Sequence, residues 1–150
     1  ESDIVGDIIA RYQDVFTFNY KFQLGASTLQ AQRHEFDSSG TFGDFTLSAN
    51  YFYLRGLDGT DLTDSRQQLY GALTYQMDED WELSTAARYD FKADEEGLRY
   101  TDLGLLYTGQ CASIGLRGRR TFTYEDTGDN ATEITLQVGL KNLGSVGTGE

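Results

Sequence analysis

Proline is absent from this sequence of 150 residues, whereas glycine occurs 17 times. Proline interrupts the interior of a sheet because it has no backbone N–H to donate, so its absence leaves the whole chain free to form strands. The 10 tyrosines and 9 phenylalanines also favour strands over helices. The composition therefore predicts an all-β fold.

Positive charge is scarce as well. The 12 lysines and arginines are outnumbered by 24 acidic residues, which gives a formal net charge of −12. A protein that follows a phosphate backbone needs clustered Lys and Arg, so we expect no nucleic-acid partner.

Long apolar runs are missing too. The longest, such as YFYL at 51–54, extend over only a few residues, so no segment matches a transmembrane helix or a signal peptide. A strand that crosses a membrane in a β-barrel is apolar only at every second position. Low average hydropathy is therefore compatible with a membrane barrel, whose signal is alternation.

Such alternation is clear at residues 15–24, VFTFNYKFQL, where every second side chain is aromatic or aliphatic. Similar segments predict about nine strands, each roughly ten residues or longer, which exceeds the ~5 to 6 residues of ordinary strands and suits a tilted crossing of a bilayer. Their predicted ranges are 3–12, 15–24, 28–38, 43–54, 66–77, 81–92, 98–108, 111–124 and 132–142.

Aromatic residues gather toward both ends of these strands, as in the two girdles of a membrane barrel. One set is Tyr12, Phe16, Tyr75, Trp81 and Tyr107, and the other is Phe22, Tyr53, Phe91, Phe122 and Tyr124. Short turns also alternate with longer acidic loops at 55–65, 93–97 and 125–131, although turns expected at 26–27 and 39–42 blur this alternation. We therefore predict an antiparallel up-and-down transmembrane β-barrel whose aromatic side faces lipid.

About nine strands is an odd number, whereas bacterial single-chain barrels have even numbers, so we expect residues 1–150 to be one part of a larger barrel. If the long loops are extracellular, the first strand starts at the outer rim and residue 1 follows a cut. The last strand, at about 132–142, then ends in the periplasm, and residues 143–150 form a periplasmic tail.

The C-terminal third resembles a known family. LGLLYTGQCASIGLRGRRTFTY at 103–124 and TEITLQVGLKNLGSVGTGE at 132–150 are similar to the end of the lipopolysaccharide-assembly outer-membrane family LptD, also called OstA. The discriminating pieces are the spacing of Tyr107 and Cys111 and the closing LKNLG at 140–144. The resemblance is specific from about residue 98 onward, and the hairpin DEDWELSTAARYDF at 78–91 is similar in style.

The resemblance implies a function. The family's barrel, in the outer membrane of Gram-negative bacteria, receives lipopolysaccharide and releases it sideways between its first and last strands, with a plug lipoprotein in its lumen. The partners implied are lipopolysaccharide, the plug, outer-membrane lipid, and the remaining N-terminal strands and periplasmic domain of the same protein. The last strand would border the lateral gate through Ile134, Leu136, Val138 and Leu140.

Cys111 is the only cysteine, at a turn expected on the periplasmic rim. Some relatives in the family that it resembles carry two adjacent cysteines there, whereas here Gln110 precedes a single one. The resemblance implies a disulfide from Cys111 to the periplasmic domain; without it, a free thiol is equally expected.

Several basic residues are expected to point into the lumen, where they contact anionic sugars or the plug, or simply balance nearby carboxylates. They are Arg88, Arg117, Arg119 and Lys141. Arg120 is expected on the lipid side near the outer rim, where a phosphate partner suits it.

Other functions have weaker signals. His34 with Glu35, Asp37, Ser38 and Ser39 allows an outer-membrane lipid hydrolase, and the acidic loops allow divalent cations, but neither shows the spacing of a catalytic or metal motif. We therefore expect no enzyme activity, no cofactor and no metal site. A porin-like channel and a soluble acidic β-sandwich, with Phe16, Phe18, Tyr20 and Phe22 in its core, stay as alternatives.

Overall fold

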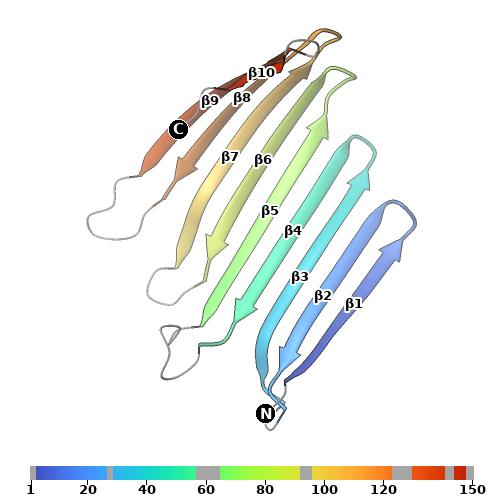
Figure 1. Cartoon of the computed structure of the whole chain (residues 1–150), viewed down its shortest axis with the longest axis vertical. Helices are drawn as coiled ribbons and strands as arrows, with labels where there is room; N and C mark the ends of the chain where they lie inside the picture. Colours follow the sequence, from blue (N-terminus) through green and yellow to red (C-terminus); the bar gives the residue numbers. More distant parts are fainter. Residues whose placement is uncertain are drawn as a thin grey trace.

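The computed structural model of the chain describes residues 3–26, 29–56, 65–91, 96–122 and 130–140, and the backbone of 144–147. These residues form a single antiparallel sheet of ten strands in the order β1 to β10, side by side in one layer (Figure 1). No helix occurs in these ranges, so the all-β, up-and-down prediction is confirmed. The strands are β1 Ile4–Tyr12, β2 Phe16–Leu24, β3 Ala31–Phe42, β4 Phe45–Leu54, β5 Arg66–Gln76, β6 Trp81–Asp90, β7 Gly97–Thr108, β8 Ala112–Thr121, β9 Ala131–Leu140 and β10 Gly144–Gly147.

The turn expected at 39–42 is wrong. β3 continues through this segment to Phe42, and the turn to β4 is Gly43-Asp44, with Gly43 at φ 60°. The SSG sequence at 38–40 is typical of a turn, but here the rings of Phe16 and Phe42 cover Gly40, where an added Cβ would lie 2.8 Å from Phe42 Cε2. Aromatic cover of this kind stabilises a glycine inside a strand.

With that correction, connection lengths alternate cleanly. One rim, here called the short-turn rim, carries the connections 13–15, 43–44, 77–80 and 109–111. The opposite rim, the long-loop rim, carries the connections 25–30, 55–65, 91–96 and 122–130. The blurring expected from the sequence came from two misplaced connections: the β3–β4 turn, and the β2–β3 connection, which covers 25–30 rather than 26–27.

The C-terminal end also differs from expectation. β9 ends at Leu140 rather than 142, and part of the expected tail forms β10, which pairs antiparallel with β9 from Gly144 opposite Leu140 to Gly147 opposite Gln137. The sequence GSVG gives little strand signal, because glycine favours turns and only two residues lie between the glycines. Pairing with the exposed half of β9 supplies what local propensity lacks.

The sheet has no hydrophobic core. Among the described residues no hydrophobic side chain is buried, and Leu103, Leu116 and Leu136 in the middle of their strands are 59%, 48% and 51% exposed. The second sheet that a β-sandwich would need to cover these side chains is not found in the described part of the chain. β1 at one edge and β10 at the other do not pair, so the sheet is open.

Candidate functional site

The strand register divides the sheet into two chemically different faces. Residues paired across antiparallel strands point to the same side, so each row of partners shares a face. One such row is Phe45, Tyr75, Leu83, Leu105, Leu116 and Leu136. This side is here called the apolar face. It includes the aromatic side of β2 that VFTFNYKFQL predicted, and it extends across every strand from β1 to β9.

Aromatic pairs border the apolar face at the short-turn rim. The rings of Phe45 and Tyr75 stack with centroids 4.5 Å apart, and those of Trp81 and Tyr107 lie 5.0 Å apart. Tyr12 lies opposite Phe16 at the same rim. The first aromatic set expected from the sequence is therefore together on one rim and one face.

A second aromatic group borders the same face toward the long-loop rim. In the middle of β2 and β3, Tyr20 stacks on Phe36 with centroids 4.4 Å apart, and from there the Tyr20 hydroxyl lies 2.5 Å from Nδ1 of His34, which is nearer to this rim. His34 also contacts the ring of Tyr53. Tyr53 lies eight residues beyond Phe45 on β4, so about 26 Å of strand separates the two aromatic borders. The residues between them are small or aliphatic in most strands.

The other side, here called the polar face, carries most of the charged side chains of the strands. Its best-defined ion pair joins Arg119 on β8 to Asp102 on β7, with Nε 2.8 Å from Oδ1 and Nη2 2.9 Å from Oδ2. Asp102 is only 8% exposed, and the Arg119 guanidinium also lies 4.7 Å from the ring centroid of Tyr100. A bidentate pair stacked on a ring fixes the guanidinium in one orientation.

Arg88 continues this arrangement across the polar face toward β5. Its guanidinium carbon lies 5.9 Å from the ring centroid of Tyr70 and 5.3 Å from that of Tyr100. Cation–π contact holds Arg88 between two tyrosines, and in the described part of the chain no carboxylate pairs with it. Its hydrogen-bond donors remain open to an anion or a sugar hydroxyl.

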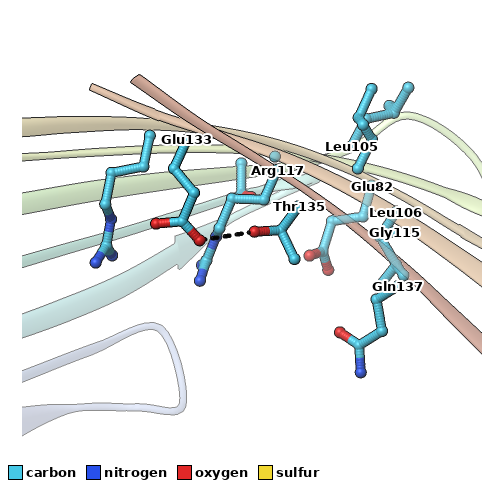
Figure 2. Close-up of a pocket in the computed structure, with 12 residues that line it drawn as sticks. Glu82, Leu105, Leu106, Gly115, Arg117, Glu133, Thr135 and Gln137 are labelled. Carbon is cyan, nitrogen blue, oxygen red and sulfur yellow. Dashed lines mark hydrogen bonds between the residues drawn. The ribbon is translucent and has the colours of Figure 1, made fainter. Parts of the chain in front are cut away.

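A groove of about 400 Å³ lies on the polar face over β6 to β9. Gly104 and Gly115 form its floor, because neither has a side chain to fill it. Figure 2 shows Glu82, Arg117, Glu133 and Gln137 projecting to one side of the sheet, while Leu105 points to the other. Glu133 accepts a hydrogen bond of 3.0 Å from the hydroxyl of Thr135 (Figure 2).

The groove presents both signs of charge. Guanidinium, carboxylate and amide groups stand within one open hollow, which is suited to hydrogen-bonding a hydrated, polyhydroxylated or peptide-like surface. Within the described ranges, no cluster of three possible metal ligands occurs.

The predicted basic residues do not all act alike. Arg88, Arg117 and Arg119 lie on the polar face, as the strand pattern predicted, and Arg117 and Arg119 line the groove. Lys141 lies outside the described residues. The partner of Arg119, Asp102, was missed from the sequence, although a lone Asp on the polar side of an apolar strand is a usable signal.

The predicted gate residues Ile134, Leu136, Val138 and Leu140 all lie on the apolar face of β9. Within the described strands, β10 pairs with β9 from Gln137 to Leu140, the end of β9 at the short-turn rim. Cys111 is exposed in the turn between β7 and β8, at the short-turn rim, and as the only cysteine of the sequence it forms no disulfide within this chain.

The hydrolase constellation is not assembled in the structure. The partner of His34 is the Tyr20 hydroxyl, and Ser38 lies four residues further along β3, about 13 Å away. Ser39 and Glu35 point to the polar face, opposite to His34. Neither Ser38 nor Ser39 therefore stands within hydrogen-bond distance of the imidazole.

A comparison with models of known protein families finds no match, and a comparison with curated protein sequences finds none either. Within the described residues, no helix is long and apolar enough to cross a membrane. The features that bear on function are therefore the two faces of the sheet and its two rims.

Proposed function

We propose that the sheet is a section of the wall of a transmembrane β-barrel in the outer membrane, with its apolar face toward lipid and its polar face toward the lumen. The observation that carries this proposal is the absence of a core, among the described residues, in a sheet with one continuous apolar side. In water, soluble monomers rarely expose a contiguous apolar surface larger than a few hundred Å². The apolar face is therefore suited to contact with the hydrocarbon of a lipid bilayer.

The dimensions support the same proposal. A separation of ~26 Å along the strands becomes about 20 Å across a bilayer at the ~40° tilt of barrel strands, close to the apolar band of such proteins. The aromatic borders at both rims match the two interfacial girdles. The strand backbones at the open edges need partners inside lipid, so further strands would complete the wall.

The particular function that we propose is the transport of lipopolysaccharide to the outer leaflet. Its support is the resemblance of residues 98–150 to LptD, together with two structural features. The polar face offers guanidinium groups and a groove suited to a sugar headgroup or to a plug lipoprotein. At one edge of the sheet, β9 and the short strand β10 offer an apolar border, which includes Ile134, past which acyl chains leave sideways.

In this proposal the long-loop rim is extracellular, and the short-turn rim with Cys111 is periplasmic. A disulfide from Cys111 would tie this rim to the protein's periplasmic domain. The protein catalyses no reaction in this account, since it only guides and releases its cargo.

Site-specific photocrosslinking tests the transport proposal. A photoreactive amino acid replaces Gln137, on the groove, or Leu136, on the apolar face, in the full-length protein expressed in a Gram-negative host. We expect a lipopolysaccharide adduct at position 137 that disappears when export from the inner membrane is blocked. The adduct at 136, formed with lipid already in the leaflet, should persist. A position 137 that never captures lipopolysaccharide during active export contradicts the transport function.

A further inference from the structure

Within the strands, Arg120 is the one arginine or lysine on the apolar face among the described residues, and it lies at the long-loop end of β8. Arg55, one residue beyond the end of β4, follows the same face by register, but its guanidinium donates a hydrogen bond to Gln30. Arg117 and Arg119, the neighbours of Arg120, belong to the opposite face. A charge in this position would be costly at the centre of a bilayer but not near the surface. Its location at the rim therefore agrees with headgroup depth.

The residues beside Arg120 differ from those beside Arg119. Arg120 lies opposite Thr101 on β7 and opposite Thr132 on β9, so a hydroxyl-bearing side chain stands on each side of it. Its guanidinium lies 5.2 Å from the ring centroid of Phe122. Arg120 is exposed, and in the described part of the chain no carboxylate pairs with it. Its charge is thus available to an external anion.

Directly along the strand from Arg120, toward the centre of the sheet, Gly118 has no side chain, and the open space above it is here called the furrow. A Cβ placed on Gly118 would meet nothing within 4 Å. The furrow is flanked by Leu103 and Ile134, which lie opposite Gly118 on the two adjacent strands and are 59% and 74% exposed. Arg120 with the apolar furrow beside it is therefore complementary to a lipid that has an anionic headgroup and an acyl chain.

We propose that Arg120, with Thr101 and Thr132, binds the phosphate of an anionic lipid whose acyl chain lies along Gly118 between Leu103 and Ile134. A guanidinium and two hydroxyls match the acceptor oxygens of a phosphate group, and guanidinium–phosphate hydrogen bonds are the strong, charge-assisted kind. This inference rests on the proposed membrane placement of the apolar face. It assigns a lipid site to the outer surface of the wall, separate from the groove on the polar face.

The test uses the full-length protein in nanodiscs that contain phosphatidylglycerol and phosphatidylcholine with identical acyl chains. Native mass spectrometry measures how many lipids of each kind remain bound. We expect the native protein to retain phosphatidylglycerol preferentially and Arg120→Gln to lower that preference roughly tenfold, as expected for the loss of a charge-assisted contact. Arg66→Gln is the control, because it removes the same charge at the same rim from the polar face.

Two further variants separate the two halves of the site. Thr101→Val with Thr132→Val should weaken phosphatidylglycerol retention in the same direction as Arg120→Gln. Gly118→Leu should fill the furrow and displace the acyl chain while leaving the charge in place. Inorganic phosphate should not compete at concentrations equal to the lipid, because the furrow selects a lipid over the free anion.

Unchanged phosphatidylglycerol retention in Arg120→Gln, or an equal loss in Arg66→Gln, overturns the lipid site. Failure of the native protein to enter nanodiscs at all, scored separately by heat-modifiable migration, overturns the membrane placement instead. The two failures are therefore distinguishable.

Discussion

Asp102 and Arg119 join β7 to β8 through two parallel hydrogen bonds of 2.8 and 2.9 Å on the polar face. The carboxylate is almost fully covered, at 8% exposure, whereas the side chain of Arg119 keeps 41% exposure. Because only one partner is well buried, water screens part of the attraction, and the pair is weaker than a fully buried one.

We expect Asp102→Asn to lower the free energy of unfolding by about 1 to 2 kcal/mol, since it leaves the guanidinium with a neutral partner. Urea unfolding of the full-length protein in liposomes measures this change. In a double-mutant cycle, Arg119→Gln should lower the free energy of unfolding less in the Asp102→Asn background than it does in the native protein. Strict additivity would show that the pair does not couple the two strands.

A second prediction concerns Gly71, which the proposed membrane placement puts near the midplane of the bilayer. This residue lies in the middle of β5, between Ala49 and Ala87, and a Cβ there meets nothing within 4 Å. A steric clash therefore cannot explain any loss of stability. In liposomes, Gly71→Arg should lower the free energy of unfolding by about 2 to 4 kcal/mol, the range for a cation at the bilayer midplane.

Gly71→Leu is the matched control and should be neutral or stabilising, because it adds apolar surface in contact with lipid. Ala72→Arg, one residue away on the polar face, should cost well under half as much as Gly71→Arg. An equal loss of free energy of unfolding in Gly71→Arg and Ala72→Arg would mean that both faces contact the same solvent, and would contradict the proposed placement of the apolar face in lipid.

A third prediction concerns the groove. A Cβ on Gly115 would make ordinary contacts of 3.7 Å with Leu106 and 3.8 Å with Gln137, so a Cβ is accommodated there without moving the backbone. Gly115→Leu should fill the floor of the groove and slow lipopolysaccharide export several-fold at nearly native stability. Surface labelling of newly exported lipopolysaccharide measures the rate, with Gly71→Leu as the control for added bulk. Native export with a filled groove would remove the groove from the transport route.

A fourth prediction concerns Cys111, which is exposed at the short-turn rim. In the full-length protein isolated from an oxidising periplasm, its thiol should resist a maleimide reagent until a reductant is added, because the proposed disulfide protects it. Cys111→Ser should change the migration of the protein on non-reducing gels. Immediate labelling without reductant would identify Cys111 as a free thiol.

Much of the fold follows from the sequence, because period-two alternation marks each strand and assigns its two faces. The nine long strands begin and end within four residues of their predicted bounds, and the aromatics at the short-turn rim share one face as expected. Local patterns of this kind need no knowledge of neighbouring strands. They were sufficient for VFTFNYKFQL, whose aromatic side becomes part of the apolar face.

What the sequence could not supply depends on register between strands. The partner of Arg119 is Asp102 because β7 and β8 pair as they do, and neither strand contains that information alone. Gly40 was misread as part of a turn, since the rings that cover it come from positions 16 and 42. β10 exists through its pairing with β9, and the groove exists because Gly104 and Gly115 lie on adjacent strands.

The most direct test of the account asks which face meets lipid. Single cysteines are placed in turn at positions 113 to 118 of β8 in the full-length Cys111→Ser protein, labelled with an environment-sensitive fluorophore, and reconstituted into bilayers that contain brominated lipids. We expect quenching by the lipids at 114, 116 and 118, and quenching by a water-soluble agent at 113, 115 and 117. Quenching by the water-soluble agent at all six positions, or lipid quenching at the odd ones, would contradict the assignment of the apolar face to the membrane.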